Sequence, residues 1–154
     1  MTKHTHTLYK IYYSDKDGNP YLVYLGRTNA PLTTRLRQHF VKHHPFQKDI
    51  DVEGVTLIEY AELKTVADMY VAEIVLINQL KPYLNADDKA RDDLTLDIDL
   101  SGLEWRVWDN VQLLEKWKST MESRSETDKA KRRENIMKMV KARMEGVKNA
   151  GVSH

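Results

Sequence analysis

The sequence predicts an α+β protein, with elements in the order β-β-α-β-α in residues 1–90 and a mostly helical C-terminal extension in residues 91–154. Two observations carry this prediction. Short segments rich in Tyr, Val, Ile and Leu flank turn-forming residues, as β-strands do, and other segments repeat apolar residues at helical spacing. A chain of 154 residues has room for one compact domain plus an extension.

The first two strands are predicted to form a β-hairpin. Segments 8–13 and 21–25 carry the strand-forming residues, and the stretch between them, SDKDGNP, is dense in turn formers. Side chains alternate between the two faces of a strand. Tyr12 and Tyr13 are therefore expected on opposite faces, and Tyr24 lies in the middle of the second strand.

The first helix is predicted from Pro31 to about residue 44, because Pro suits a first helical turn and apolar residues recur at every fourth position from Leu32 to Phe40. Arg35 and His39 are four residues apart and so project from a common face. Either this face is only solvated, or Arg35 binds phosphate oxygens, which its planar guanidinium group matches.

A third strand is predicted at residues 55–63. A capping pattern that begins with Thr65 predicts the start of a second helix, and this helix is expected to end before Pro82. This helix is apolar nearly all round, as buried helices are. Glu73 is the only carboxylate in its segment VAEIVLINQL. Burying a carboxylate costs several kcal/mol unless a cation, a proton or a hydrogen bond compensates. Glu73 therefore either lies on a solvent-facing stripe or binds a divalent metal.

The extension is predicted to contain a second hairpin at residues 94–108, a helix at 111–122 and a basic amphipathic helix at 128–148. The last helix carries a narrow apolar stripe formed by Ile136, Val140, Met144 and Val147. The three tryptophans are expected to pack the extension into a small second core: Trp105, Trp108 and Trp117.

The composition excludes several kinds of site and argues against a membrane protein. The chain has no cysteine, so it has no disulfide framework, no thiolate zinc site and no cysteine nucleophile. No apolar run approaches the roughly 18 residues of a membrane span, and the first residues, MTKHTHTLYK, lack the apolar core of a signal peptide. A cytoplasmic protein with no membrane partner is expected.

The charge is unevenly distributed although the net charge is only +1. No acidic residue lies between Asp17 and Asp49, and the last residues are again basic, whereas residues 87–109 are acidic. The two basic segments are either ordinary surface or two surfaces that face phosphate groups. Candidate DNA-contacting residues are Arg27, Arg37, Lys42, Lys131, Arg132 and Arg133. The last helix could equally be a solvated or dimerising helix.

Five short motifs, in order, resemble those of the GIY-YIG nuclease superfamily over residues 7–88. They are Lys10-Ile11-Tyr12, Tyr24-Leu25-Gly26, the segment from Arg35 to His39, Glu73, and the segment from Lys81 to Asn85. The family fold is a small three-stranded antiparallel sheet flanked by helices. The first motif departs from the family in having Lys10 where the family name has glycine, and Leu25 replaces isoleucine.

The resemblance implies a role for each matching residue. Tyr12 would act as the general base or help to activate it, Tyr24 would position the water or the phosphate, and Arg35 would stabilise the transition state. His39 and Asn85 would support the site, and Glu73 would bind one Mg²⁺ or Mn²⁺ ion. Because Tyr13 adjoins Tyr12 and points to the other face, only one of them can join Arg35, and we expect Tyr12.

The function implied is a metal-dependent DNA endonuclease, with duplex or branched DNA as its substrate and the extension as a DNA-binding element. One active site cuts one strand, so cutting both strands requires a homodimer or successive nicks. A phage or mobile-element origin would suit a small free-standing nuclease. The alternative is a non-catalytic DNA-binding or assembly protein that keeps the nuclease fold. A binding protein would be sensitive to salt but indifferent to Mg²⁺.

Overall fold

The computed structural model describes residues 6–41, 50–85, 92–121 and 126–152, and it confirms the α+β class. The order β-β-α-β-α is found as predicted, followed by a short strand and helices. The elements are β1 (His6–Ser14), β2 (Pro20–Thr28), α1 (Leu32–Phe40), a 3₁₀ turn η1 (Val52–Gly54), β3 (Val55–Leu63), α2 (Val66–Leu80), β4 (Arg106–Val107), α4 (Val111–Met121) and α5 (Glu126–Val152).

The sheet is antiparallel with the strand order β2-β1-β3-β4. The expected sheet of three strands is therefore corrected to four, because Arg106 and Val107 from the extension pair with Tyr60 and Glu59 of β3. The predicted hairpin of β1 and β2 is confirmed. In its turn the Asp15 side chain accepts hydrogen bonds from two backbone N–H groups, and Gly18 takes the positive φ angle of +83° that glycine allows.

The second predicted hairpin, at residues 94–108, is wrong. Between residues 92 and 105 the described chain forms no strand, although its residues alternate as a strand would. The alternation has no neighbouring strand to pair with, and Leu96 is 72% exposed. The end of this segment packs against the core beside α2 through Leu100, Leu103 and Trp105.

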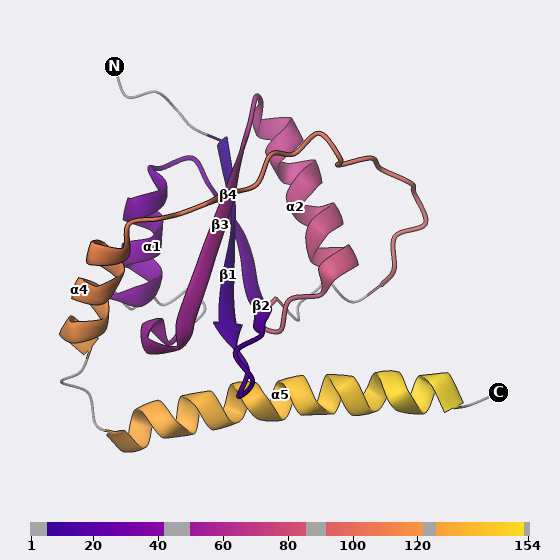
Figure 1. The fold of residues 1–154 in the computed structure, drawn as a ribbon. Helices are drawn as coiled ribbons and strands as arrows, with labels where there is room; N and C mark the ends of the chain where they lie inside the picture. The colour runs from indigo at the N-terminus through magenta and orange to yellow at the C-terminus, as the bar shows by residue number, and fades with distance from the viewer. Residues whose placement is uncertain (1–5, 42–49, 86–91, 122–125, 153–154) are drawn as a thin grey trace.

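Two helices cover opposite faces of the sheet (Figure 1). On the face of α1, the buried core includes Ile11, Leu36 and Phe40, together with residues from α4 and α5. On the face of α2, the buried core comprises Leu8, Leu25, Met69, Ala72, Leu76 and Ile77. Burying each large apolar side chain contributes about 1.5–3 kcal/mol, so both faces stabilise the fold.

The expected second core of tryptophans is wrong, because the extension joins the core already formed on the α1 face. Trp117 of α4 is buried, stacks on Trp108 with ring centroids 5.9 Å apart, and contacts Phe40 at 5.8 Å. Lys10, by contrast, lies over the ring of Trp105 on the other face. The sheet has two apolar faces to cover, and the extension contributes to both.

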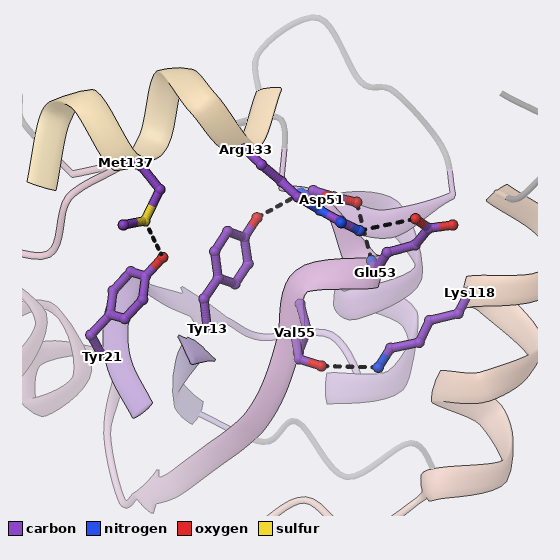
Figure 2. A network of polar contacts seen from close by, with 8 residues as sticks. All are labelled: Tyr13, Tyr21, Asp51, Glu53, Val55, Lys118, Arg133 and Met137. Carbon is purple, nitrogen blue, oxygen red and sulfur yellow. Dashed lines mark hydrogen bonds and ion pairs between the residues drawn. The ribbon is translucent and has the colours of Figure 1, made fainter. Parts of the chain in front are cut away.

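Helix α5 lies beyond the end of the sheet formed by the β1–β2 hairpin (Figure 1) and begins and ends a few residues outside the predicted range of 128–148. Figure 2 shows its anchor: Arg133 forms ion pairs with Asp51 at 3.0 Å and Glu53 at 3.1 Å. Of the predicted apolar stripe, Ile136 and Val140 are buried, whereas Met144 is 58% exposed. The side chain of Val147 lies outside the described residues.

The polar contacts in Figure 2 hold the hairpin, η1 and two helices of the extension together. The Tyr13 hydroxyl accepts a hydrogen bond from the backbone N–H of Asp51 at 2.8 Å, and Lys118 of α4 donates to the carbonyl of Val55 at 3.1 Å. Tyr21 contacts Met137 of α5. In the described part of the chain, no helix is long and apolar enough to cross a membrane.

Candidate active site

A hydrogen-bonded group of polar side chains lies between the sheet and α1. The Tyr9 hydroxyl on β1 lies 2.6 Å from His39 Nε2, and Arg35 donates from Nε to the same hydroxyl at 3.2 Å. The ring of Tyr24 on β2 is 5.0 Å from that of His39 and 6.0 Å from that of Tyr9. The prediction that Arg35 and His39 share a helix face is confirmed, because both reach Tyr9.

Glycine at position 26 makes room for this group. Gly26 pairs with Tyr9 across the two strands. A Cβ atom added to Gly26 would lie 2.5 Å from the Tyr9 hydroxyl oxygen and 2.8 Å from the Tyr24 ring. No real Cβ approaches so closely, so the two tyrosine rings occupy the space that any other side chain would need.

The expectation that Tyr12 joins Arg35 is wrong. Tyr12 points to the other face of β1, where its hydroxyl bonds to Glu59, and burial together with this carboxylate raises the pKa of Tyr12. Tyr13, the other alternative, bonds to Asp51 instead. The residue that meets Arg35 is Tyr9, three positions before Tyr12.

The cause is a β-bulge in the hairpin. The register of β1 against β2 shifts between Ile11 and Tyr12, so that Tyr24 lies opposite Ile11 rather than opposite Lys10. The shift moves Tyr24 onto the face that carries Tyr9. An unbulged hairpin counted from its turn would place Tyr24 on the face of Tyr12, and no residue in the sequence signals the extra position.

Burial is the main influence on the ionisation of Tyr9. It raises the pKa of the hydroxyl, the neighbouring Tyr24 raises it further, and Arg35 opposes the rise. Tyr9 is fully buried, whereas Tyr24 is partly exposed. At neutral pH Tyr9 is therefore a phenol, and it donates its proton to His39 when Nε2 of the imidazole carries none.

Glu73 lies on α2, against the other face of the sheet. Its side chain is 7% exposed, and its Oε1 accepts a hydrogen bond from Arg27 Nε at 3.2 Å. The guanidinium carbon of Arg27 also lies 4.2 Å from the centroid of the Tyr70 ring. Glu73 is thus a buried, paired carboxylate, and the solvent-stripe alternative is wrong. No pattern in the sequence indicates Tyr70 as a neighbour of this pair.

The Tyr9 group and the Glu73–Arg27 pair lie on opposite faces of the sheet. Consecutive residues of β2, an edge strand, contact the two groups. Gly26 adjoins Tyr9 on one face, and Arg27 bonds to Glu73 on the other. The side-chain amide of Asn85 holds the preceding residue, Leu25, accepting from its N–H at 2.9 Å and donating to its carbonyl at 3.0 Å. Asn85 therefore fixes the part of β2 that carries Tyr24 of one group and Arg27 of the other.

The described site offers a metal ion one carboxylate, that of Glu73. Among the described residues, no group of three or more His, Asp or Glu side chains could enclose a metal ion. Mg²⁺ is often held in proteins by one or two carboxylates, with substrate phosphate and water completing its octahedron. Glu73, a buried hard oxygen donor, fits such a cation, provided that Arg27 gives up its place.

The candidate DNA-contacting residues differ in whether they are exposed or form ion pairs within the protein. Arg37 on α1 and Lys131 on α5 are exposed. Arg27 bonds to Glu73, and Arg133 faces the protein, where its ion pairs hold α5. Lys42 and the side chain of Arg132 lie outside the described residues.

Comparisons of this chain with protein-family models, with curated proteins and with solved structures find no match. The geometry of the site itself therefore carries the functional argument.

Proposed function

We propose that this protein is a metal-dependent DNA endonuclease that works in the manner of the GIY-YIG nucleases it resembles. The observation that carries the proposal is the hydrogen-bonded chain of Arg35, Tyr9 and His39 beside Tyr24. Such a chain can take a proton from an attacking water while an arginine faces the charge that develops on a phosphate group. The tyrosine of the first motif is then Tyr9 in place of Tyr12.

The burial of Tyr9 determines the route of the proton. Tyr24 is partly exposed and its hydroxyl hydrogen-bonds Tyr9, so Tyr24 is the group that can touch the water. As the water oxygen attacks phosphorus, its proton passes to the Tyr24 oxygen, the Tyr24 proton passes to Tyr9, and the Tyr9 proton passes to His39 Nε2. Both tyrosines end neutral, and His39 ends as an imidazolium.

Arg35 has two tasks in this scheme. Its Nε–H donates to the Tyr9 oxygen, which stabilises negative charge there while the protons move. Its Nη1 donates to Gln38 Oε1 at 3.3 Å, and phosphate oxygens, whose geometry the guanidinium fork matches, could take the place of that contact. A divalent cation bound at Glu73 would supply charge neutralisation at the leaving oxygen. Asn85 acts through the backbone of Leu25 and is a positioning residue.

The test is cleavage of supercoiled plasmid and of a branched DNA, each with and without Mg²⁺ or Mn²⁺. Cleavage that requires the metal and is lost in Arg35→Gln and in Glu73→Gln is the expected result, with a loss of about 100-fold or more for each variant. Arg37→Gln removes the same charge from the exposed face of the same helix. As a candidate DNA contact it is expected to weaken binding of DNA, but at saturating DNA it should retain the metal-dependent cleavage. Salt-sensitive binding of both DNAs with no cleavage would favour the alternative of a DNA-binding protein.

A further inference from the structure

The guanidinium group of Arg27 has two partners on α2, one turn apart. Its Nε lies 3.2 Å from Glu73 Oε1, and its central carbon lies 4.2 Å from the ring centroid of Tyr70. Residues three apart on a helix are neighbours on its surface. The helix therefore offers Arg27 one anionic contact and one aromatic contact side by side.

The two members of the ion pair differ in exposure. The side chain of Glu73 is 7% exposed, whereas that of Arg27 is 37% exposed. If Arg27 left without replacement, the buried carboxylate would lose the compensating charge of its ion-pair partner, which is unfavourable. Arg27, in contrast, can turn toward solvent at little cost. A second cation in the place of Arg27 would restore this compensation, and Arg27 is the partner that is exposed enough to be exchanged.

We propose that Arg27 occupies Glu73 in the free protein and competes with the divalent cation, so that the carboxylate becomes available when a phosphate group draws Arg27 away. The inference rests on the proposed function and adds to it a coupling between binding of metal and binding of substrate. In this account Arg27 is a positioning residue. The contact with Tyr70 keeps the guanidinium group near the site during the exchange, because a cation is attracted to an aromatic face.

The coupling has a thermodynamic consequence in both directions. If a bound phosphate group raises the affinity of Glu73 for the cation, the cation must raise the affinity for the phosphate group by the same factor. The free protein should then bind the metal weakly, and removal of the Arg27 charge should strengthen binding without any DNA. A merely structural ion pair predicts the opposite, because its loss would loosen α2 and weaken every site on it.

The experiment is a titration of the full chain with Mn²⁺ in the absence of DNA, followed by the electron paramagnetic resonance signal of free Mn²⁺. Arg27→Gln is expected to bind Mn²⁺ more tightly than wild type, on the order of tenfold. Arg27→Lys keeps a charge but loses the planar fork, and it is expected to fall between the two. Arg106→Gln is the matched control, because β4 lies at the opposite edge of the sheet, and it should bind as wild type does.

Two further variants separate the possible failures. Glu73→Gln should abolish the site, and Mn²⁺ binding that survives this change would contradict the metal site of the proposed function. If Glu73→Gln removes binding while Arg27→Gln and Arg27→Lys bind no more tightly than wild type, the competition is refuted and the proposed function stands. Tyr70→Leu leaves the ion pair in place but removes the aromatic contact of Arg27, so its affinity for Mn²⁺ is expected to fall between those of wild type and Arg27→Gln.

Discussion

The two faces of strand β2 hold their buried polar groups in different ways. On the α1 face, Tyr9 and His39 form a chain of hydrogen bonds, with one cation, Arg35, at its side. On the α2 face, Glu73 is held by an ion pair with Arg27. A hydrogen-bonded chain can pass a proton from one group to the next, whereas an ion pair can exchange one cation for another. In the function that we propose, the α1 face would handle the protons and the α2 face would hold the metal.

The largest effect on stability is expected where the two faces meet, in Gly26→Ala. The new methyl group would overlap the Tyr9 hydroxyl at 2.5 Å, so the ring must shift, and the free energy of unfolding should fall by about 1–3 kcal/mol. Denaturation in urea measures this change. Gly102→Ala is the control, since nothing lies within 4 Å of its added Cβ. An equal effect of both substitutions would contradict the close packing of Tyr9 against Gly26.

A second prediction concerns the free energy of unfolding at alkaline pH, to which Tyr9 on the α1 face is expected to contribute and Glu73 on the α2 face is not. Burial raises the pKa of Tyr9 above that of an unfolded tyrosine, which is about 10. The folded state therefore keeps this proton when the unfolded state has lost it. The stability that the proton provides is complete below about pH 10 and decreases above it, by about 1.4 kcal/mol per pH unit for one group.

Tyr9→Phe should remove this contribution and make the decrease above pH 10 shallower than in wild type. The free energy of unfolding, measured in urea at several alkaline pH values, tests the expectation. Glu73→Gln, on the other face, should leave the wild-type slope unchanged. Parallel pH profiles for wild type and Tyr9→Phe would mean that the hydroxyl of Tyr9 is not buried as described.

The smallest effect is expected at α5, which contributes to the core of the α1 face alone. Arg133 is half exposed and pairs with Asp51 and Glu53, so Arg133→Gln should lower the free energy of unfolding by about 1 kcal/mol or less. Lys138→Gln breaks an exposed ion pair on the same helix and should have almost no effect. Amide hydrogen exchange sharpens the comparison, because Arg133→Gln should speed exchange in α1 more than in α2.

Local sequence signals predicted most elements of the fold correctly. The turn between β1 and β2, the capping threonine at Thr65 and the spacing of Arg35 and His39 each act within a few residues, and each appears in the structure as expected. The strictly alternating segment that begins at Leu94 failed as a predictor, because a strand also needs a partner, and β3 pairs with residues further along the chain.

The candidate site was predicted less completely, for the same reason. A β-bulge is a property of two paired strands, so the sequence could not show that Tyr24 would meet Tyr9 and not Tyr12. The pairing of Arg27 with Glu73 joins residues 46 positions apart and has no local signature either. The apolar character of α2 left two alternatives for Glu73, a solvent-facing stripe or a metal site, and it did not single out Arg27 as the partner beside which Glu73 is buried.

The most direct test compares two tyrosines of β1 that lie on opposite faces of the sheet, Tyr9 and Tyr12. Tyr9→Phe and Tyr12→Phe each remove one buried or half-buried hydroxyl, and circular dichroism can establish that both variants fold. In the metal-dependent plasmid assay, we expect Tyr9→Phe to lose cleavage by about 100-fold or more, while Tyr12→Phe cleaves nearly as wild type does. Full activity in Tyr9→Phe, or the loss in Tyr12→Phe instead, would contradict the assignment of the active site to the α1 face.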